Sequence, residues 1–200
     1  MKNTKEITDL DEMRHRYFNE GQKVDKQWKE SLRWHLKNGD QFRTVDLIGD
    51  IALRSDPSVN ELAPDVLKLL EQDDDFIGME VVSCILAYMK LPEYVEYFLN
   101  FYETDRGYEY DDNVKDRIIF ALGNIINKIS DFQLKRTVAN FLLNNLSPEQ
   151  STDNKSAAYA SIMTAMGINK RGRPPLETEE ELKQNMDWKL VEAFKEKYIH

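Results

Sequence analysis

Cysteine is nearly absent from this chain, which has 200 residues and one cysteine, Cys84. No intrachain disulfide is therefore possible, and cysteine usage gives no sign of an oxidising compartment. Long apolar runs are also absent, because none approaches the roughly 20 residues that a membrane-spanning helix needs. Residues 1–6 lack the apolar stretch of a secretory signal. These absences predict a soluble, cytoplasmic protein that is long enough to bury a core without disulfides or metals.

Motifs of catalysis and of metal binding are missing as well. The three histidines, His15, His35 and His200, neither cluster in sequence nor occur at the spacing of a zinc-protease helix. The acidic run 73–75 lacks the ligand spacing and the mid-loop glycine of an EF-hand. No phosphate-binding glycine loop and no nucleophile elbow is present. The sequence therefore predicts a protein that is not an enzyme and that holds neither a cofactor nor a metal.

Positive charge is scarce in the middle of the chain. The net charge is −9, and residues 56–116 hold sixteen acidic side chains against four basic ones. Because phosphate contacts need lysine and arginine, a net-acidic chain is a poor general ligand for nucleic acid or for anionic membranes. The acidic middle instead favours a basic protein partner.

Apolar residues recur at helical spacing almost throughout, and no strand-like alternation lasts beyond a few residues. The predicted fold is therefore all-α. Helices are expected near residues 7–21, 28–39, 42–54, 60–71, 76–89, 93–103, 113–129, 132–146, 154–166 and 178–200.

Four small-apolar segments, anchored at Ala52, Ala87, Ala121 and Ala165, lie 35, 34 and 44 residues apart. Such a recurrence in a helical chain indicates stacked helical hairpins, an α-solenoid. We expect the small residues to let the two helices of one hairpin approach closely. The predicted organisation is a single domain of residues 1–200. It comprises N-terminal cap helices (1–40), hairpins (41–169), a basic proline-containing linker (170–177) and a C-terminal capping helix (178–200) that starts with a capping box at Thr178 and Glu181.

The best repeat unit runs from Asp112 to Ile125. An aspartate starts this helix, a valine follows, and the segment ends in an apolar-x-x-Ala-Leu-Gly-x-Ile pattern, of which 154–168 is a weaker copy. This unit resembles a HEAT repeat. The resemblance implies a right-handed solenoid of about four HEAT-like hairpins, and it implies a fold rather than an activity. The inter-helix Asp–Arg ladder usual in that family is mostly missing, and the offset of 44 implies an insertion near 147–154.

Two acidic connectors, 71–75 and 103–112, each join the first helix of a predicted hairpin to the second. Because equivalent loops of a solenoid stack along one edge, we expect the two to be neighbours and to form an acidic ridge that binds a partner. The alternative is that these acids only cap helix N-termini, as Asp75 and Asp112 would, and keep the loops solvated. The predicted partner-binding residues of the acidic ridge are Glu71, Asp73, Asp74, Asp75, Glu103, Asp105, Tyr108, Glu109, Tyr110 and Asp111.

The segment Lys170-Arg171-Gly172-Arg173-Pro174-Pro175 resembles the core of an AT-hook, which lies extended in the minor groove of A/T-rich DNA. The resemblance implies nucleic-acid contacts by Lys170, Arg171 and Arg173. The segment occurs once and four glutamates follow it closely, so the alternative is a linker whose cations meet helix C-terminal carbonyls or the acidic ridge.

The expected function is that of a non-catalytic protein-binding module with no membrane association. In size, charge and fold class the chain resembles bacterial immunity proteins, which occupy the basic cleft of a cognate toxin. The alternative function is a DNA- or RNA-associated factor that uses residues 170–175. Trp28 and Trp188 are expected to be packed and Trp34 to be exposed, and the oligomeric state stays open.

Overall fold

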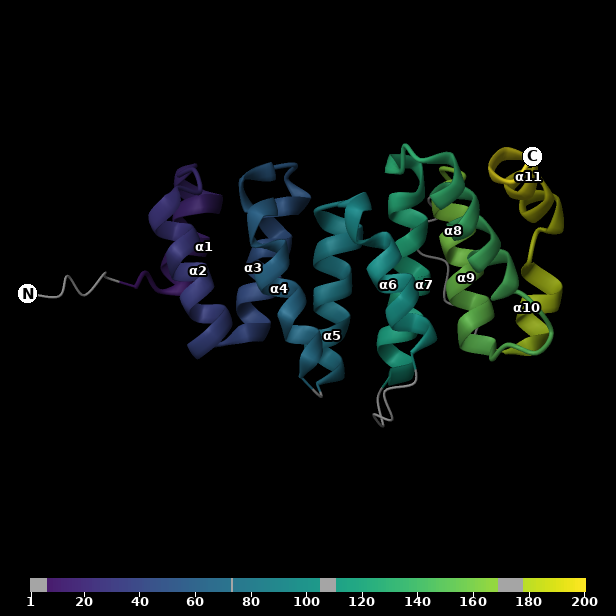
Figure 1. The fold of residues 1–200 in the computed structure, drawn as a ribbon, viewed down its shortest axis with the longest axis horizontal. Helices are drawn as coiled ribbons and strands as arrows, with labels where there is room; N and C mark the ends of the chain where they lie inside the picture. Colours follow the sequence, from purple (N-terminus) through teal and green to yellow (C-terminus); the bar gives the residue numbers. More distant parts are fainter. Residues whose placement is uncertain (1–6, 73, 105–110, 169–177) are drawn as a thin grey trace, which may run out of the picture. The chain divides into compact units, whose positions relative to one another are not determined.

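The structure, a computed structural model, describes residues 7–72, 74–104, 111–168 and 178–200 (Figure 1). Within these ranges every regular element is helical: eleven α-helices, α1–α11, and five short 3₁₀ or π segments, η1–η5, with no β-strand. The all-α prediction is therefore confirmed. The chain divides into two compact units, Met1–Met89 (unit 1) and Lys90–His200 (unit 2).

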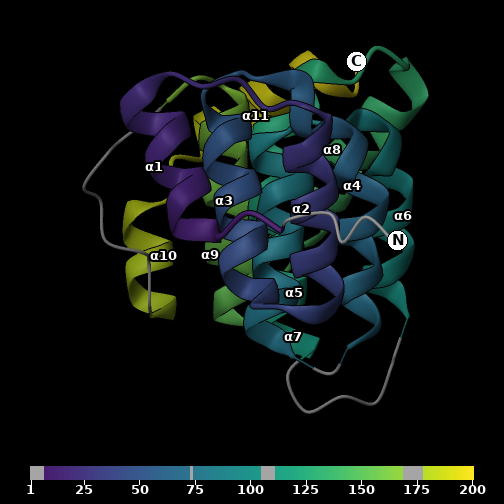
Figure 2. The same cartoon turned by 90° about the vertical axis from the view of Figure 1, so that its left-hand side faces the viewer.

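The helices of unit 1 form two sets that alternate along the chain: α1, α3 and α5 in one set, and α2 and α4 in the other. Helix α3 contacts both α1 and α5, while α2 contacts α4. Figure 2 shows α1 and α3 on one side of unit 1 and α2 and α4 on the other. The elements are α1 (Leu10–Glu20), α2 (Lys26–Asn38), α3 (Gln41–Leu53), η1 (Pro57–Leu62), α4 (Ala63–Leu67), η2 (Lys68–Glu71), α5 (Asp75–Val82) and the π-helical η3 (Ser83–Tyr88).

Aspartates determine where the helices of unit 1 begin. Asp9, Asp25 and Asp40 precede α1, α2 and α3, and each side chain accepts hydrogen bonds from backbone N–H groups of the first turn. The helix expected over residues 60–71 is instead a series of three shorter segments, η1, α4 and η2. Prolines stand in the first turns of η1 and α4, where a missing N–H costs nothing.

Unit 2 is held together by the contacts of α9, which packs against α7, α8, α10 and α11. Its elements are η4 (Pro92–Tyr94), α6 (Val95–Glu103), α7 (Asp111–Ile125), η5 (Ile126–Lys128), α8 (Phe132–Asn144), α9 (Thr152–Ala165), α10 (Glu179–Asn185) and α11 (Trp188–Tyr198).

The predicted C-terminal helix is two helices. The capping box of Thr178 and Glu181 is confirmed at the start of α10. That helix ends at Asn185, and Asp187 accepts hydrogen bonds from the backbone N–H groups of the first turn of α11. The prediction of one continuous helix was wrong because an aspartate that caps a new helix stands inside the apolar pattern. Trp188, the first residue of α11, is 56% exposed, so the prediction that it packs was wrong, whereas Trp28 is buried and Trp34 is exposed as predicted.

Small residues permit close helix contacts, although between different helices from those expected. A Cβ atom added at Gly123 of α7 would lie 2.5 Å from Ser161 Cα of α9, and nearer still to the Ser161 carbonyl oxygen. Gly49 of α3 lies similarly against the Tyr88 ring of η3. These contacts join the second helices of successive predicted hairpins. For these two glycines, the expectation that small residues bring the two helices of one hairpin together was therefore wrong.

Candidate functional site

Only part of the acidic ridge is visible in the structure. Glu71 and Asp74 are exposed in unit 1, and Glu103 is exposed in unit 2. Asp75 is the first residue of α5 and Asp111 is the first residue of α7. The side chains of Asp75, Asp111 and Asp112 are not among those that the structure describes. Whether the two connectors are neighbours stays a prediction. The ridge residues outside the described ranges are Asp73, Asp105, Tyr108, Glu109 and Tyr110.

Capping accounts for one described acid of the ridge. The N-cap of α5 is Asp74, whose Oδ1 accepts a hydrogen bond of 3.1 Å from the Ile77 N–H. The sequence had assigned this role to Asp75, one residue too late. Glu71 and Glu103 instead stand at the last positions of η2 and α6, where a carboxylate faces the negative end of the helix dipole. Helix capping therefore does not explain these two glutamates.

Phe76, at the start of a helix predicted from residue 76, is exposed beside the first acidic connector. Its side chain is 66% exposed, and it follows Asp74 by two residues. The buried face of this helix carries Ile77, Val81 and Ile85. Phe76 precedes that series by one position, which rotates it by roughly 100° away from the buried face. The helical phase of the apolar residues was the signal that would have identified it.

Ion pairs between helices engage several carboxylates on the described surface of unit 1. Arg14 of α1 reaches Asp46 and Asp50 of α3 at 2.5 Å each. Arg33 of α2 binds Asp65 of α4 at 3.0 Å. Further pairs join Arg43 to Asp11, and Arg33 and Lys29 to Glu61. Arg–Asp pairs between helices therefore occur in unit 1, while the expectation that the ladder of the HEAT family is mostly missing stays a prediction.

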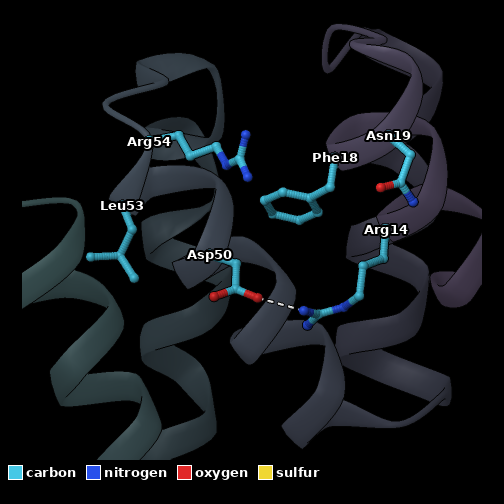
Figure 3. A pocket seen from close by; sticks show the side chains of 6 residues that line it. All are labelled: Arg14, Phe18, Asn19, Asp50, Leu53 and Arg54. Carbon is cyan, nitrogen blue, oxygen red and sulfur yellow. Dashed lines mark hydrogen bonds and ion pairs between the residues drawn. The ribbon is translucent and has the colours of Figure 1, made fainter.

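A pocket of about 440 Å³ opens in unit 1 between α1 and α3 (Figure 3). The guanidinium of Arg54, at the C-cap of α3, lies over the Phe18 ring, with 4.5 Å between the guanidinium carbon and the ring centroid. Figure 3 shows Arg54 and Arg14 approaching Phe18 from different sides. The lining residues are Arg14, Phe18, Asn19, Asp50, Leu53 and Arg54.

The other buried ionisable groups have structural roles. Lys155 of α9 is 8% exposed, and its Nζ donates to Glu179 Oε1 at 2.7 Å and to the Pro148 carbonyl at 3.2 Å. The hydrogen bond from Lys155 lowers the pKa of Glu179, and the pair fastens α10 to α9. Cys84 is buried, and desolvation raises the pKa of its thiol, which disfavours the nucleophilic thiolate.

The basic segment with Lys170, Arg171 and Arg173 lies outside the described residues. Across the ranges that the structure describes, no cluster of three or more His, Cys, Asp or Glu side chains is arranged to hold a metal ion. No helix in those ranges has the length and apolar character needed to cross a bilayer. No protein-family model, curated protein or solved structure matches this chain. The similarity to HEAT repeats and to immunity proteins stays a prediction.

Proposed function

We propose that this protein is a non-catalytic binding module whose acidic ridge engages a basic protein partner. We also propose that its hairpins form a HEAT-like solenoid with the ridge along one edge. The alternating packing within each unit, α1–α3–α5 in unit 1 and α7–α9 in unit 2, supports this architecture. A single observation carries the functional proposal: two exposed carboxylates of the acidic ridge form no ion pair and no capping hydrogen bond in the described part of the chain.

Those carboxylates belong to Glu71 and Glu103. Several acids on the faces of unit 1 are paired with arginine or lysine, as Asp46, Asp50 and Asp65 are. Within the described residues, Glu71 and Glu103 form no ion pair and accept no capping hydrogen bond. Their helix-end positions make a small unfavourable contribution to stability. A partner with lysine or arginine would offset it.

Phe76 adds an apolar contact to this charge. An exposed aromatic ring beside Asp74 suits a lysine or arginine side chain, because the aliphatic stem packs on the ring while the charged head meets a carboxylate. Aromatic side chains also dominate binding energy at protein interfaces. The immunity role implied by the resemblance is one form of this binding, in which the cations line the cleft of a toxin.

Charge reversal at the ridge tests the proposal. The double variant Glu71→Lys/Glu103→Lys leaves the Asp74 cap intact, and the control Glu192→Lys/Glu196→Lys makes the same charge change at exposed positions of α11. The probe is a short synthetic lysine- and arginine-rich peptide, titrated calorimetrically at low and at physiological salt. We expect the ridge variant to lose about 1–2 kcal/mol of binding free energy, and the control to lose clearly less.

The nucleic-acid alternative is an arm of the same experiment. An A/T-rich DNA duplex replaces the peptide, and Arg171→Ala/Arg173→Ala replaces the ridge variant. The binding-module proposal is wrong if the arginine variant abolishes duplex binding while the ridge variant binds the peptide as the wild type does. Equal losses in the ridge variant and in the α11 control would also refute it, because they would show that only net charge matters.

A further inference from the structure

The pocket between α1 and α3 carries less negative charge than the unit around it. Residues 1–89 contain eighteen acidic and twelve basic side chains. The pocket lining contains two guanidiniums, those of Arg14 and Arg54, and one carboxylate, that of Asp50. With Asp46, which also pairs with Arg14, the charges at the pocket sum to zero, so the preference for a ligand depends on which charged group is left without a partner.

The positive charge available to a ligand is that of Arg54. Arg14 is not available, since its two terminal nitrogens donate to Asp46 and Asp50, and these three groups together carry one net negative charge. Arg54 makes a different contact, with its guanidinium carbon over the Phe18 ring, 4.5 Å from the ring centroid. Among the residues that the structure describes, its guanidinium forms no ion pair and no hydrogen bond.

Stacking on Phe18 prepares Arg54 to bind a carboxylate. A guanidinium uses its flat face for the ring and keeps its N–H donors at the edge, where they match the two oxygens of a carboxylate. The ring also restricts the rotamers of a long side chain, so less conformational entropy is lost when an anion binds. The geometry therefore favours two parallel hydrogen bonds from Arg54 to one anionic group.

The remaining walls are the apolar side chains of Phe18 and Leu53 together with the amide of Asn19. Leu53, next to Arg54, is 55% exposed, and Phe18 supplies the aromatic surface. The volume of about 440 Å³ is within the range of small-molecule sites, roughly 300–1,000 Å³. We propose that the pocket binds a small organic carboxylate with a short apolar chain, whose carboxylate pairs with Arg54 while the chain covers Phe18 and Leu53. This site is separate from the acidic ridge and has the opposite charge preference.

A matched ligand series tests the assignment. The probes are hexanoate, hexylammonium, hexanol and acetate, each titrated into the full-length protein while the amide resonances of unit 1 are followed by NMR. Hexanoate is expected to bind in the millimolar range and to shift the resonances of Phe18, Leu53 and Arg54. Hexylammonium and hexanol should bind at least roughly tenfold more weakly, because neither offers an anion to the guanidinium. Acetate should be weaker by a similar factor because it lacks the apolar chain.

Two variants locate the interaction. Arg54→Met keeps an apolar stem over Phe18 and should lower hexanoate affinity roughly tenfold. Arg43→Met makes the same charge change on α3, outside the pocket lining. This control should change the affinity for hexanoate less than twofold. Absence of hexanoate binding, equal binding of hexylammonium, or full retention of binding by Arg54→Met overturns the proposal. The ridge variant Glu71→Lys/Glu103→Lys should bind hexanoate normally, so failure of the ridge and failure of the pocket are distinguishable.

Discussion

The contact between α7 and α9 leads to a sharp prediction about stability. Gly123→Ala adds one methyl group that would lie 2.5 Å from Ser161 Cα and 2.8 Å from the Ser161 carbonyl carbon. These are backbone atoms of a packed helix, so no side-chain rotation relieves the overlap. Ser161 also joins α9 to α7 by hydrogen bonding. Its hydroxyl donates to the Ile119 carbonyl at 2.5 Å and to the Phe120 carbonyl at 3.0 Å. The helices must separate to admit the methyl group.

Three contributions, one favourable and two unfavourable, determine the magnitude. Alanine is favoured over glycine inside a helix by up to about 1 kcal/mol. Overpacking a tight contact costs typically about 1–3 kcal/mol, and more where backbone has to move. The lengthened hydroxyl hydrogen bonds add roughly 1 kcal/mol. The sum is a net destabilisation of about 1–3 kcal/mol for Gly123→Ala.

Gly49→Ala is the matched control, since Gly49 is also a mid-helix glycine. Its nearest neighbour is the Tyr88 ring, 2.9 Å from the added Cβ, and a ring can rotate where a backbone cannot. We expect a change of less than about 1 kcal/mol for this control. Urea unfolding followed by far-UV circular dichroism measures both variants. If Gly123→Ala is as stable as the wild type, α7 and α9 do not approach as closely as described, and the packing argument fails.

Three other predictions follow from the contacts of single side chains. Ser161→Ala should lower the unfolding free energy by about 1 kcal/mol, because two helix carbonyls lose their second donor; thermal unfolding measures this, and an unchanged midpoint would contradict it. Lys155 lowers the pKa of Glu179 below its ordinary value of 4.5, so this pair stabilises the fold fully above about pH 4.5 and loses that effect as the pH falls through the lower, folded-state pKa. The stability difference between wild type and Lys155→Met should therefore shrink on acidification from about pH 6 to pH 3, and a constant difference would show that the pair is not responsible. Because burial raises the pKa of Cys84, iodoacetamide should label the native thiol at least roughly a hundredfold more slowly than the thiol in urea, as mass spectrometry can follow.

Much of the secondary structure could be predicted because its causes are local. Apolar periodicity placed α1, α2 and α3 within a few residues, and the capping box of Thr178 and Glu181 was recognisable from its spacing. The errors arose where a local signal competed with the periodicity. Asp187 starts a new helix inside an apolar pattern, and Asp74 rather than Asp75 caps α5. A cap depends on one hydrogen bond to a particular N–H, which spacing alone locates only to within a residue.

The candidate sites were less predictable because they depend on which helices meet. The acidic composition indicated a ridge, and the structure added that Glu71 and Glu103 stand at helix ends without a capping role. Phe18 belonged to the apolar face of a predicted helix, and nothing in its neighbourhood along the chain pointed to Arg54. The two are 36 positions apart in the sequence and meet only because α1 packs on α3.

The amino-acid order by itself determined that the chain is helical, where most helices begin and end, and that its middle is strongly acidic. These properties follow from backbone geometry, hydrogen bonds within one turn and the count of charges, all of which act over a few residues. The tertiary structure alone decided that glycine and serine join α7 to α9, that arginines of one helix neutralise aspartates of another, and that Arg54 lies on Phe18. Such contacts depend on the position and rotation of whole helices, which are set by burial of the entire apolar surface rather than by any short segment.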